Sequence, residues 1–154
     1  MAAARRRAPG FTLIEMLVVL ALIAAASALA AGALTGGFAG LRLRSSANTV
    51  AAQLRYTRAQ AMATGEAQRF VIDPHAHRWS APHGHHGDLP PTLGVAFIGA
   101  RETQPSPGEG AIVFFPDGAS TGGRVQFTAK RAAWNVDVAW LTGEVKVARA
   151  EVTP

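Results

Sequence analysis

The sequence predicts an α+β fold. A long N-terminal helix, with a transmembrane first half and an amphipathic second half, packs on a head made of an antiparallel β-sheet or sandwich. Two observations support this prediction. The chain is apolar near its start over a length that can span a bilayer, and no proline interrupts residues 11–72. After Gly65 the spacing of apolar residues changes from the helical period to the alternation of strands, with turns rich in proline and glycine.

The apolar segment covers residues 11–34 and contains one charged side chain, Glu15. At a rise of about 1.5 Å per residue, a helix of this length crosses a hydrocarbon core of about 30 Å. Arg5, Arg6 and Arg7 precede the segment, and by the positive-inside rule they favour a cytoplasmic N-terminus. We therefore expect a single membrane pass, with the rest of the chain outside the inner membrane.

Glu15 needs an explanation, because a charge deep in a bilayer costs about 2.5–3.5 kcal/mol and usually has a partner. Cleavage between Gly10 and Phe11 would create one, since the new α-amine of Phe11 is cationic near neutral pH. Glu15 follows four residues later, on the same helix face. It can pair with that amine or with the amine of a neighbouring chain. The second pairing would set the register of apolar helices that pack side by side.

The sequence RRRAPG followed by FTLIEMLVVLALIA resembles the class III signal of type IV pilins and of type II secretion pseudopilins. The resemblance implies that a prepilin peptidase cuts after Gly10 and methylates the new N-terminal residue, Phe11. It also implies that Glu15 is the glutamate that this family carries at the fifth position of the mature chain. Two alternatives are an ordinary secretory signal cut after Ala30 and an uncut signal anchor, but neither explains Glu15.

Residues 35–65 are predicted to continue the helix as its amphipathic half. Glycines weaken its start by about 1 kcal/mol each relative to alanine, which admits a bend or local melting there: Gly32, Gly36, Gly37 and Gly40. Apolar residues beyond them share one helix face: Leu43, Ala47, Val50, Leu54 and Ala61. Arginines can occupy the other faces: Arg42, Arg44, Arg55 and Arg58. Gly65 is the expected C-terminal stop.

The head, residues 66–154, is expected to hold six or seven short strands. They fall in the segments 69–73, 78–81, 92–98, 111–115, 124–128, 134–141 and 144–147. Alternation predicts which side chains of the last three segments point inward: Val125, Phe127, Trp134, Val136, Val138, Trp140, Val145 and Val147. Thr142 and Gly143 are expected to form a tight turn between the last two strands.

Two segments of the head, IVFFPDGASTGGRVQF and WNVDVAWLTGEV, resemble the C-terminal domain of minor pseudopilin H (GspH) of type II secretion. Minor type IV pilins of the FimT/FimU kind share this domain, and one class of them binds DNA. The sequence Trp140-Leu141-Thr142-Gly143 favours the secretion branch. The middle of the head, Asp73 to Pro107, matches neither group.

The charge balance argues against nucleic acid as the main partner. The net charge is +5 and the pI is near 11, but beyond Gly10 only 12 basic residues stand against 10 acidic ones. Arg124, Lys130 and Arg131 form a small basic cluster near the predicted sheet, which could contact phosphate in a DNA-uptake protein. We favour a solvated face or a subunit contact for this cluster.

No metal, cofactor or catalytic residue is predicted. The histidines lie within one short segment: His75, His77, His83, His85 and His86. Such a group can bind Zn, Ni or Cu, but no acidic or cysteine ligand completes an obvious site, and the segment is interpreted as a mobile, solvated loop. A contact that changes with pH below about 6.5 is the alternative.

Other candidate motifs have simpler interpretations. PDGASTGG lacks the Lys-Ser/Thr pair of a phosphate-binding loop and is expected to be a hairpin turn. No nucleophile motif is present, so an enzyme is not expected. Trp79, Trp134 and Trp140 could be ligand platforms, but core packing is preferred for Trp134 and Trp140.

These features predict a non-enzymatic minor pseudopilin with a cleaved leader (1–10), an assembly helix (11–34), an amphipathic helix (35–65) and a periplasmic head (66–154). The alternatives are a minor type IV pilin that binds DNA and a secreted or anchored module with a conventional signal. The resemblance implies several partners: a prepilin peptidase, other minor and major pseudopilins, an inner-membrane assembly platform and secreted exoproteins.

Overall fold

The computed structural model describes residues 12–99, 108–130 and 132–150, with the backbone alone described at residues 31–39. The chain divides into two compact units, Met1–Phe38 and Ala39–Pro154. Helix α1, Leu13–Thr64, begins in the first unit and ends in the second. The leader, with Gly10, and the adjoining Phe11 lie outside the described residues.

Helix α1 follows from a sequence that is rich in alanine and leucine and free of proline. Its backbone stays helical through all four glycines, so the local melting that they admit is not observed. The helix ends at the predicted stop. Gly65 takes a positive φ of 71°, and its N–H donates to the carbonyl oxygen of Ala61 at 3.1 Å, which is the αL form of C-terminal cap.

The second half of α1 buries the predicted face. All five predicted residues are fully buried: Leu43, Ala47, Val50, Leu54 and Ala61. Ala51 and Thr57 extend the same face, and both are also fully buried. Thr57 can lie there because its hydroxyl donates to the carbonyl oxygen of Gln53 at 2.8 Å, which satisfies its hydrogen bond within the helix.

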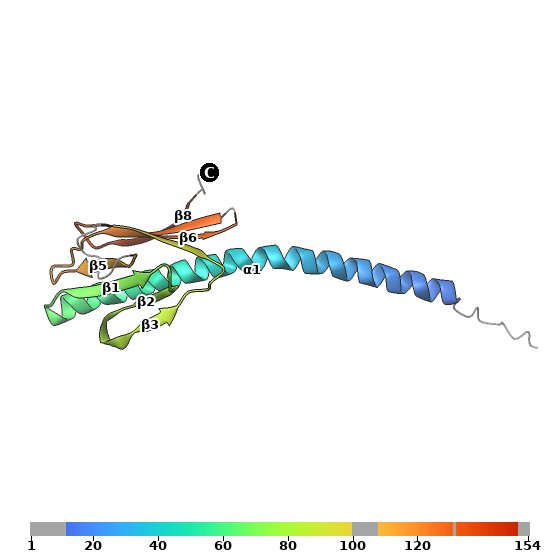
Figure 1. The fold of residues 1–154 in the computed structure, drawn as a ribbon, viewed down its shortest axis with the longest axis horizontal. Coiled ribbons are helices and arrows are strands. Elements are labelled where there is room, and N and C mark those ends of the chain that lie inside the picture. The colour runs from blue at the N-terminus through green and yellow to red at the C-terminus, as the bar shows by residue number, and fades with distance from the viewer. Residues whose placement is uncertain (1–11, 100–107, 131, 151–154) are drawn as a thin grey trace, which may run out of the picture. The chain divides into compact units, whose positions relative to one another are not determined.

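The head contains two four-stranded antiparallel sheets. Figure 1 shows how their strands are arranged. The first has the order β3-β2-β1-β5 and comprises β1 (Gln68–Asp73), β2 (Arg78–Ser80), β3 (His86–Asp88) and β5 (Gly110–Phe114). The second has the order β4-β6-β7-β8 and comprises β4 (Gly94–Ile98), β6 (Gly123–Ala129), β7 (Ala132–Val138) and β8 (Val145–Ala150). The predicted antiparallel head on a long helix is confirmed.

One core joins the helix to both sheets. Large side chains from the first sheet face it: Phe70, Ile72, Trp79, Ile112 and Phe114. Side chains from the second sheet face it as well: Val125, Phe127, Val136, Val138 and Val145. Burying each such side chain contributes roughly 1.5–3 kcal/mol. Pairing across strands aligns them, with Phe70 opposite Ile112 in the first sheet and Val125 opposite Val136 in the second.

One prediction about the strands was wrong, and a second holds in part. Strand β7 ends at Val138, so Trp140 lies in the following turn and is 69% exposed instead of buried. The segment PDGASTGG turns the chain back on itself as predicted, since Phe114 pairs antiparallel with Ser120 and the N–H of Phe115 donates to the carbonyl oxygen of Ala119 at 2.9 Å. It links β5 in one sheet to β6 in the other, and the glycines at its end, Gly122 and Gly123, adopt positive φ values of 70° and 150°.

The other two tryptophans are buried to different degrees. Trp134 is half-buried against the core, and the guanidinium carbon of Arg44 lies 5.7 Å from its ring centroid in a cation–π contact. Trp79 is almost fully buried and stacks on Phe70, with 6.1 Å between ring centroids. Both rings therefore contribute to packing, which the sequence predicted for Trp134.

Candidate assembly segment and head surface

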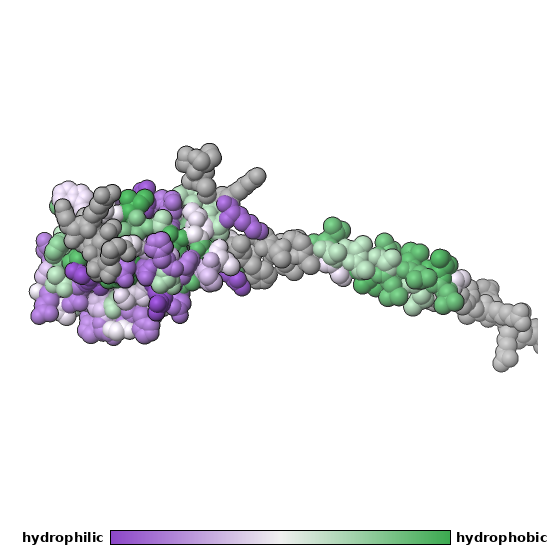
Figure 2. All heavy atoms as spheres, viewed as in Figure 1, coloured by the Kyte–Doolittle hydropathy of each residue, from purple (hydrophilic) through white to green (hydrophobic). Residues whose placement is uncertain are grey.

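The first unit presents an apolar helix. Residues 13–30 form the one helix segment, among the described residues, that is long and apolar enough to cross a membrane. Every side chain in this range is exposed, and Figure 2 shows the apolar surface. The large side chains are Leu13, Ile14, Met16, Leu17, Val18, Val19, Leu20, Leu22, Ile23 and Leu29. Because exposed apolar area costs about 25 cal/mol per Å² in water, this segment requires lipid or other helices around it.

The polar groups of this segment are arranged to suit such surroundings. Ser27 donates its hydroxyl to the carbonyl oxygen of Ile23 at 2.8 Å, so its hydrogen bond is made within the helix. Glu15 and Ser27 are the only polar side chains in residues 13–30. Glu15 therefore carries the one full charge of the segment.

Glu15 lies in the first turn of α1. Its backbone N–H lies 3.3 Å from Oγ1 and 3.1 Å from the carbonyl oxygen of Thr12, and both accept it. Thr12 is thus the N-cap, and Glu15 is the third helical residue, which is the spacing of a capping box. A carboxylate at this end is also favoured by the helix dipole. The role of Thr12 was not predicted, although the spacing Thr-x-x-Glu is its signal.

The predicted pairing of Glu15 with the Phe11 amine stays a prediction, because Gly10 and Phe11 lie outside the described residues. Among the described residues, no side chain donates to the Glu15 carboxylate. In lipid, the capped backbone would leave that carboxylate as the group in need of a cation.

The histidine segment is a structured hairpin, which corrects its interpretation as a mobile loop. Strand β3, a short 3₁₀ turn (Pro82–Gly84) and β2 hold it. His85 stacks on Tyr56 of α1 with ring centroids 4.6 Å apart, and the Tyr56 hydroxyl lies 3.3 Å from Nδ1 of His83. No group of three metal-ligating side chains forms within the described part of the chain.

Asp73 organises the turn that leads from β1 into this hairpin. Its Oδ1 accepts the backbone N–H groups of Ala76 at 2.8 Å and His75 at 2.9 Å. The pKa of Asp73 lies below its usual value, mainly because the N–H of Ala76 stabilises the carboxylate. The charged form of Asp73 therefore supports the turn at neutral pH.

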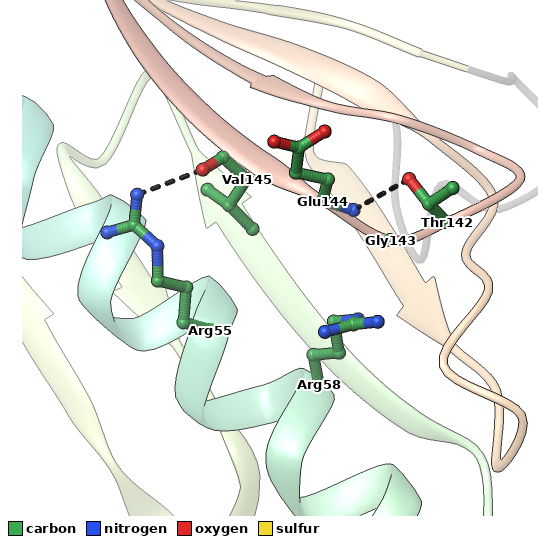
Figure 3. Close-up of a pocket in the computed structure, with 6 residues that line it drawn as sticks. All are labelled: Arg55, Arg58, Thr142, Gly143, Glu144 and Val145. Carbon is green, nitrogen blue, oxygen red and sulfur yellow. Dashed lines mark hydrogen bonds between the residues drawn. The ribbon is translucent and has the colours of Figure 1, made fainter.

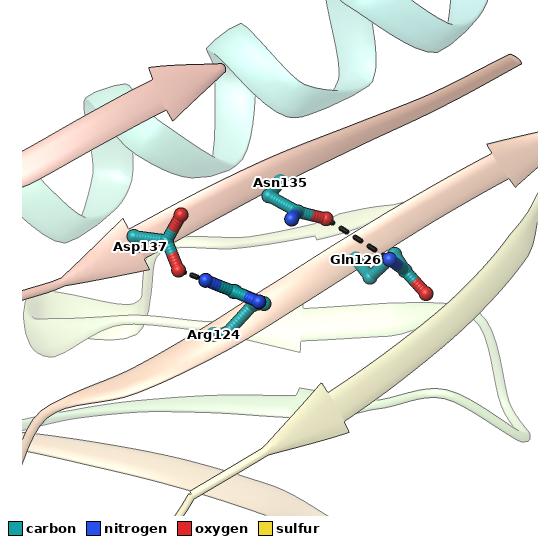
Figure 4. Close-up of polar contacts among 4 residues, drawn as sticks. All are labelled: Arg124, Gln126, Asn135 and Asp137. Carbon is teal, nitrogen blue, oxygen red and sulfur yellow. Dashed lines mark hydrogen bonds and ion pairs between the residues drawn. The ribbon is translucent and has the colours of Figure 1, made fainter. Parts of the chain in front are cut away.

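Among the described residues, the two members of the predicted basic cluster, Arg124 and Lys130, do not lie together. Arg124 pairs with Asp137 across β6 and β7, beside a hydrogen bond of 3.1 Å between Gln126 and Asn135 (Figure 4). Lys130 follows the far end of β6, about 20 Å from Arg124 at 3.3 Å per residue. Arg131 lies outside the described residues. Arg124 is therefore neutralised locally and is separated from Lys130.

A cavity of about 500 Å³ lies between α1 and the turn that joins β7 to β8. Figure 3 shows the residues that line it: Arg55, Arg58, Thr142, Gly143, Glu144 and Val145. Arg55 donates to the carbonyl oxygen of Val145 at 2.9 Å, and Nε of Arg58 donates to that of Gly118 at 3.0 Å. The sequence predicted these arginines on faces away from the core, but it carries no signal that they share a cavity.

Comparison with known proteins gives matches to the N-terminal segment and to the head. The family model "Type II transport protein GspH" matches residues 46–143, and the model "Prokaryotic N-terminal methylation motif" matches residues 5–31. A relative named "Type II secretion system protein H", from Xanthomonas campestris pv. campestris, is 62% identical over 142 residues. The aligned part covers 92% of this chain and 84% of the relative.

Two solved structures share the fold. The minor pseudopilin EpsH from the type 2 secretion system of Vibrio cholerae is 17% identical, with a TM-score of 0.55, over 70% of this chain and 97% of that one. The type IV minor pilin FimU of Pseudomonas aeruginosa is 15% identical, with a TM-score of 0.52, over 69% of this chain and 92% of that one.

An exposed apolar helix that continues into a head of two antiparallel sheets defines the class of pilin-like subunits. The 62% identical relative and the GspH family model identify one family within this class. The chain belongs to the GspH family of type II transport proteins.

Proposed function

We propose that the chain is a minor pseudopilin, a non-catalytic structural subunit of a type II secretion pseudopilus that helps export folded proteins across the outer membrane. The observation that carries this proposal is the exposed apolar segment of residues 13–30, joined by one helix to a packed head. The identity of 62% with a type II secretion system protein H supports the secretion branch.

Assembly would use the apolar segment twice. The segment first holds the precursor in the inner membrane, with its N-terminus cytoplasmic and its head periplasmic, as the leader arginines favour. It then packs against the same segment of other subunits when the chain is extracted. Because apolar surface leaves lipid only to be covered by other helices, the transfer costs little free energy.

The partners in this proposal follow from the same steps. A prepilin peptidase would remove residues 1–10 and methylate Phe11, and the exposed helix would contact major and minor pseudopilins. An inner-membrane platform would drive extraction, and exoproteins would be the cargo. The DNA-uptake alternative gains no support from Arg124, which pairs with Asp137 and is separated from Lys130 by the length of β6.

Mass spectrometry of the chain purified from its own bacterium tests the proposal. We expect the loss of residues 1–10 and the gain of one methyl group on Phe11. The variant Gly10→Val should keep the leader, whereas the neighbouring control Ala8→Val should be processed normally. A mature chain that begins after Ala30, or one that keeps its leader while export proceeds, would contradict the proposal.

A further inference from the structure

The cavity beside Arg55 and Arg58 holds positive charge that the described part of the head does not neutralise. No acidic side chain among the described residues pairs with either guanidinium. Glu144, the one acidic residue of the lining, is bound to Lys146 at 3.1 Å, and its carboxylate points away from Arg58 in Figure 3. Each arginine uses one donor on a carbonyl oxygen, so the guanidinium groups keep donors for a ligand.

The surroundings of this cavity are apolar and exposed. Trp140 and Leu141 immediately precede the lining residues of the turn, and they are 69% and 66% exposed. Met62 is exposed one helical turn beyond Arg58. Phe115 is exposed at the start of the turn that follows β5, residues 115–122. Arginine beside tryptophan is the composition that dominates the binding energy of protein interfaces.

The turns that carry these residues are held in place. Ser120 donates its N–H to the carbonyl oxygen of Trp140 at 2.8 Å and its hydroxyl to that of Ala139 at 3.1 Å. The N–H of Gly143 donates to the same Ala139 carbonyl at 2.8 Å. A surface that is already fixed loses little conformational entropy when a partner binds.

We propose that this end of the head binds a neighbouring protein subunit through an acidic segment. One carboxylate enters the cavity and takes hydrogen bonds from Arg55 and Arg58, while adjacent apolar side chains cover Trp140 and Leu141. This inference rests on the proposed function, which supplies neighbouring subunits. Guanidinium groups match carboxylates in geometry as well as in charge.

A phosphate backbone fits this surface less well. Nucleic acid binds where several free cations lie in a row. Here two arginines are flanked by exposed apolar side chains, and the acidic Asp117 and Glu144 lie on the two turns. The charge and the apolar surface together favour a protein segment.

Site-specific photocross-linking in the native bacterium tests this inference. The full-length chain carries p-benzoylphenylalanine in place of Leu141, and the linked peptide is identified by mass spectrometry. We expect a link to another secretion subunit, within a few residues of an aspartate or glutamate. Arg58→Glu should lower the yield at least about tenfold, because it places like charges together. Changing the partner's acidic residue to arginine should then restore the yield.

Matched controls separate the cavity from general effects. Arg149→Glu changes an exposed charge on β8 and should leave the Leu141 link unchanged. Benzoylphenylalanine at Ile98, which is exposed on β4, should not give the same product. If Arg58→Glu unfolds the head, Arg58→Gln decides, since it can still donate to Gly118 but lacks the charge. It should also lower the yield.

A link to nucleic acid, a link to a segment without acidic residues, or an undiminished yield in folded Arg58→Gln would overturn the inference. These results would leave the proposed function intact, provided that the chain is cut after Gly10 and is required for export. A chain that is not processed would instead overturn the proposed function.

Discussion

Phe127 and Trp140 are two large aromatic residues of the second sheet region with opposite environments. Phe127 is fully buried between the helix and the sheets, whereas Trp140 is 69% exposed on a turn. The burial of an aromatic side chain is what makes it a stabilising residue. The two residues should therefore respond very differently to truncation.

Truncation of each residue to alanine tests this difference. Phe127→Ala should lower the free energy of unfolding by about 3–5 kcal/mol, because it leaves a cavity in the core. Trp140→Ala should change it by less than about 0.5 kcal/mol, as is usual for surface substitutions. Urea unfolding of the full chain in non-ionic detergent measures both. A large loss for Trp140→Ala would show that its ring packs on the head.

Alternation predicted Val125, Phe127, Val136 and Val138 correctly, because each lies within a regular strand. It failed at Trp140. Alternate residues point to the same face only within a strand, and β7 ends at Val138. The cavity arginines could not be predicted, since Arg58 and Gly118 meet through contacts between segments far apart in the sequence.

At the scale of elements, two turns brace one another at one end of the head. They are the turn after β5, residues 115–122, and the turn after β7, residues 139–144. Gly143 lies at their contact with a positive φ of 62°, and a Cβ there would collide with the carbonyl oxygen of Gly118. The absence of a side chain at Gly143 therefore allows both turns to approach α1.

Alanine at Gly143 should cost more than alanine at Gly65. Gly65 also has a positive φ, 71°, but a Cβ there meets nothing within 4 Å. Gly65→Ala should therefore lose only the conformational term, about 1–2 kcal/mol. Gly143→Ala adds the collision and should lose at least about 1 kcal/mol more. The same unfolding measurement compares them, and equal losses would contradict the bracing.

Most elements were predictable because their signals are local. The buried face of α1, its stop at Gly65 and the approximate positions of seven strands follow from period and glycine placement. Strand β3 was missed, since His86-Gly87-Asp88 has no alternating apolar pattern. The choice between one sheet and a sandwich of two was left open, because β1 pairs with β5 some 40 residues later and no local signal specifies such pairing.

At the scale of the whole molecule, one charged residue is expected to matter for assembly of the subunit but not for its insertion into the membrane. Glu15 is the single charge of the apolar segment, and its helix turn is already capped by Thr12. Glu15→Val should leave insertion and cleavage intact, because both depend on the leader and on apolar length. Incorporation into the pseudopilus should fall about tenfold, which corresponds to 1.4 kcal/mol of lost pairing.

Cross-linking of the variant to neighbouring subunits in the bacterium measures this loss. Ser27→Val is the matched control, since its hydroxyl is satisfied within the helix and its replacement should not change incorporation. Normal incorporation of Glu15→Val would show that the carboxylate has no role in register.

One face of helix α1 is buried in the head between Leu43 and Ala61, in a core shared with both sheets. Tension applied along the axis of this part of α1 would act parallel to that interface. Such a load shears all the buried contacts together instead of peeling them apart in turn. The head is thus suited to resist unfolding when a force pulls on its helix.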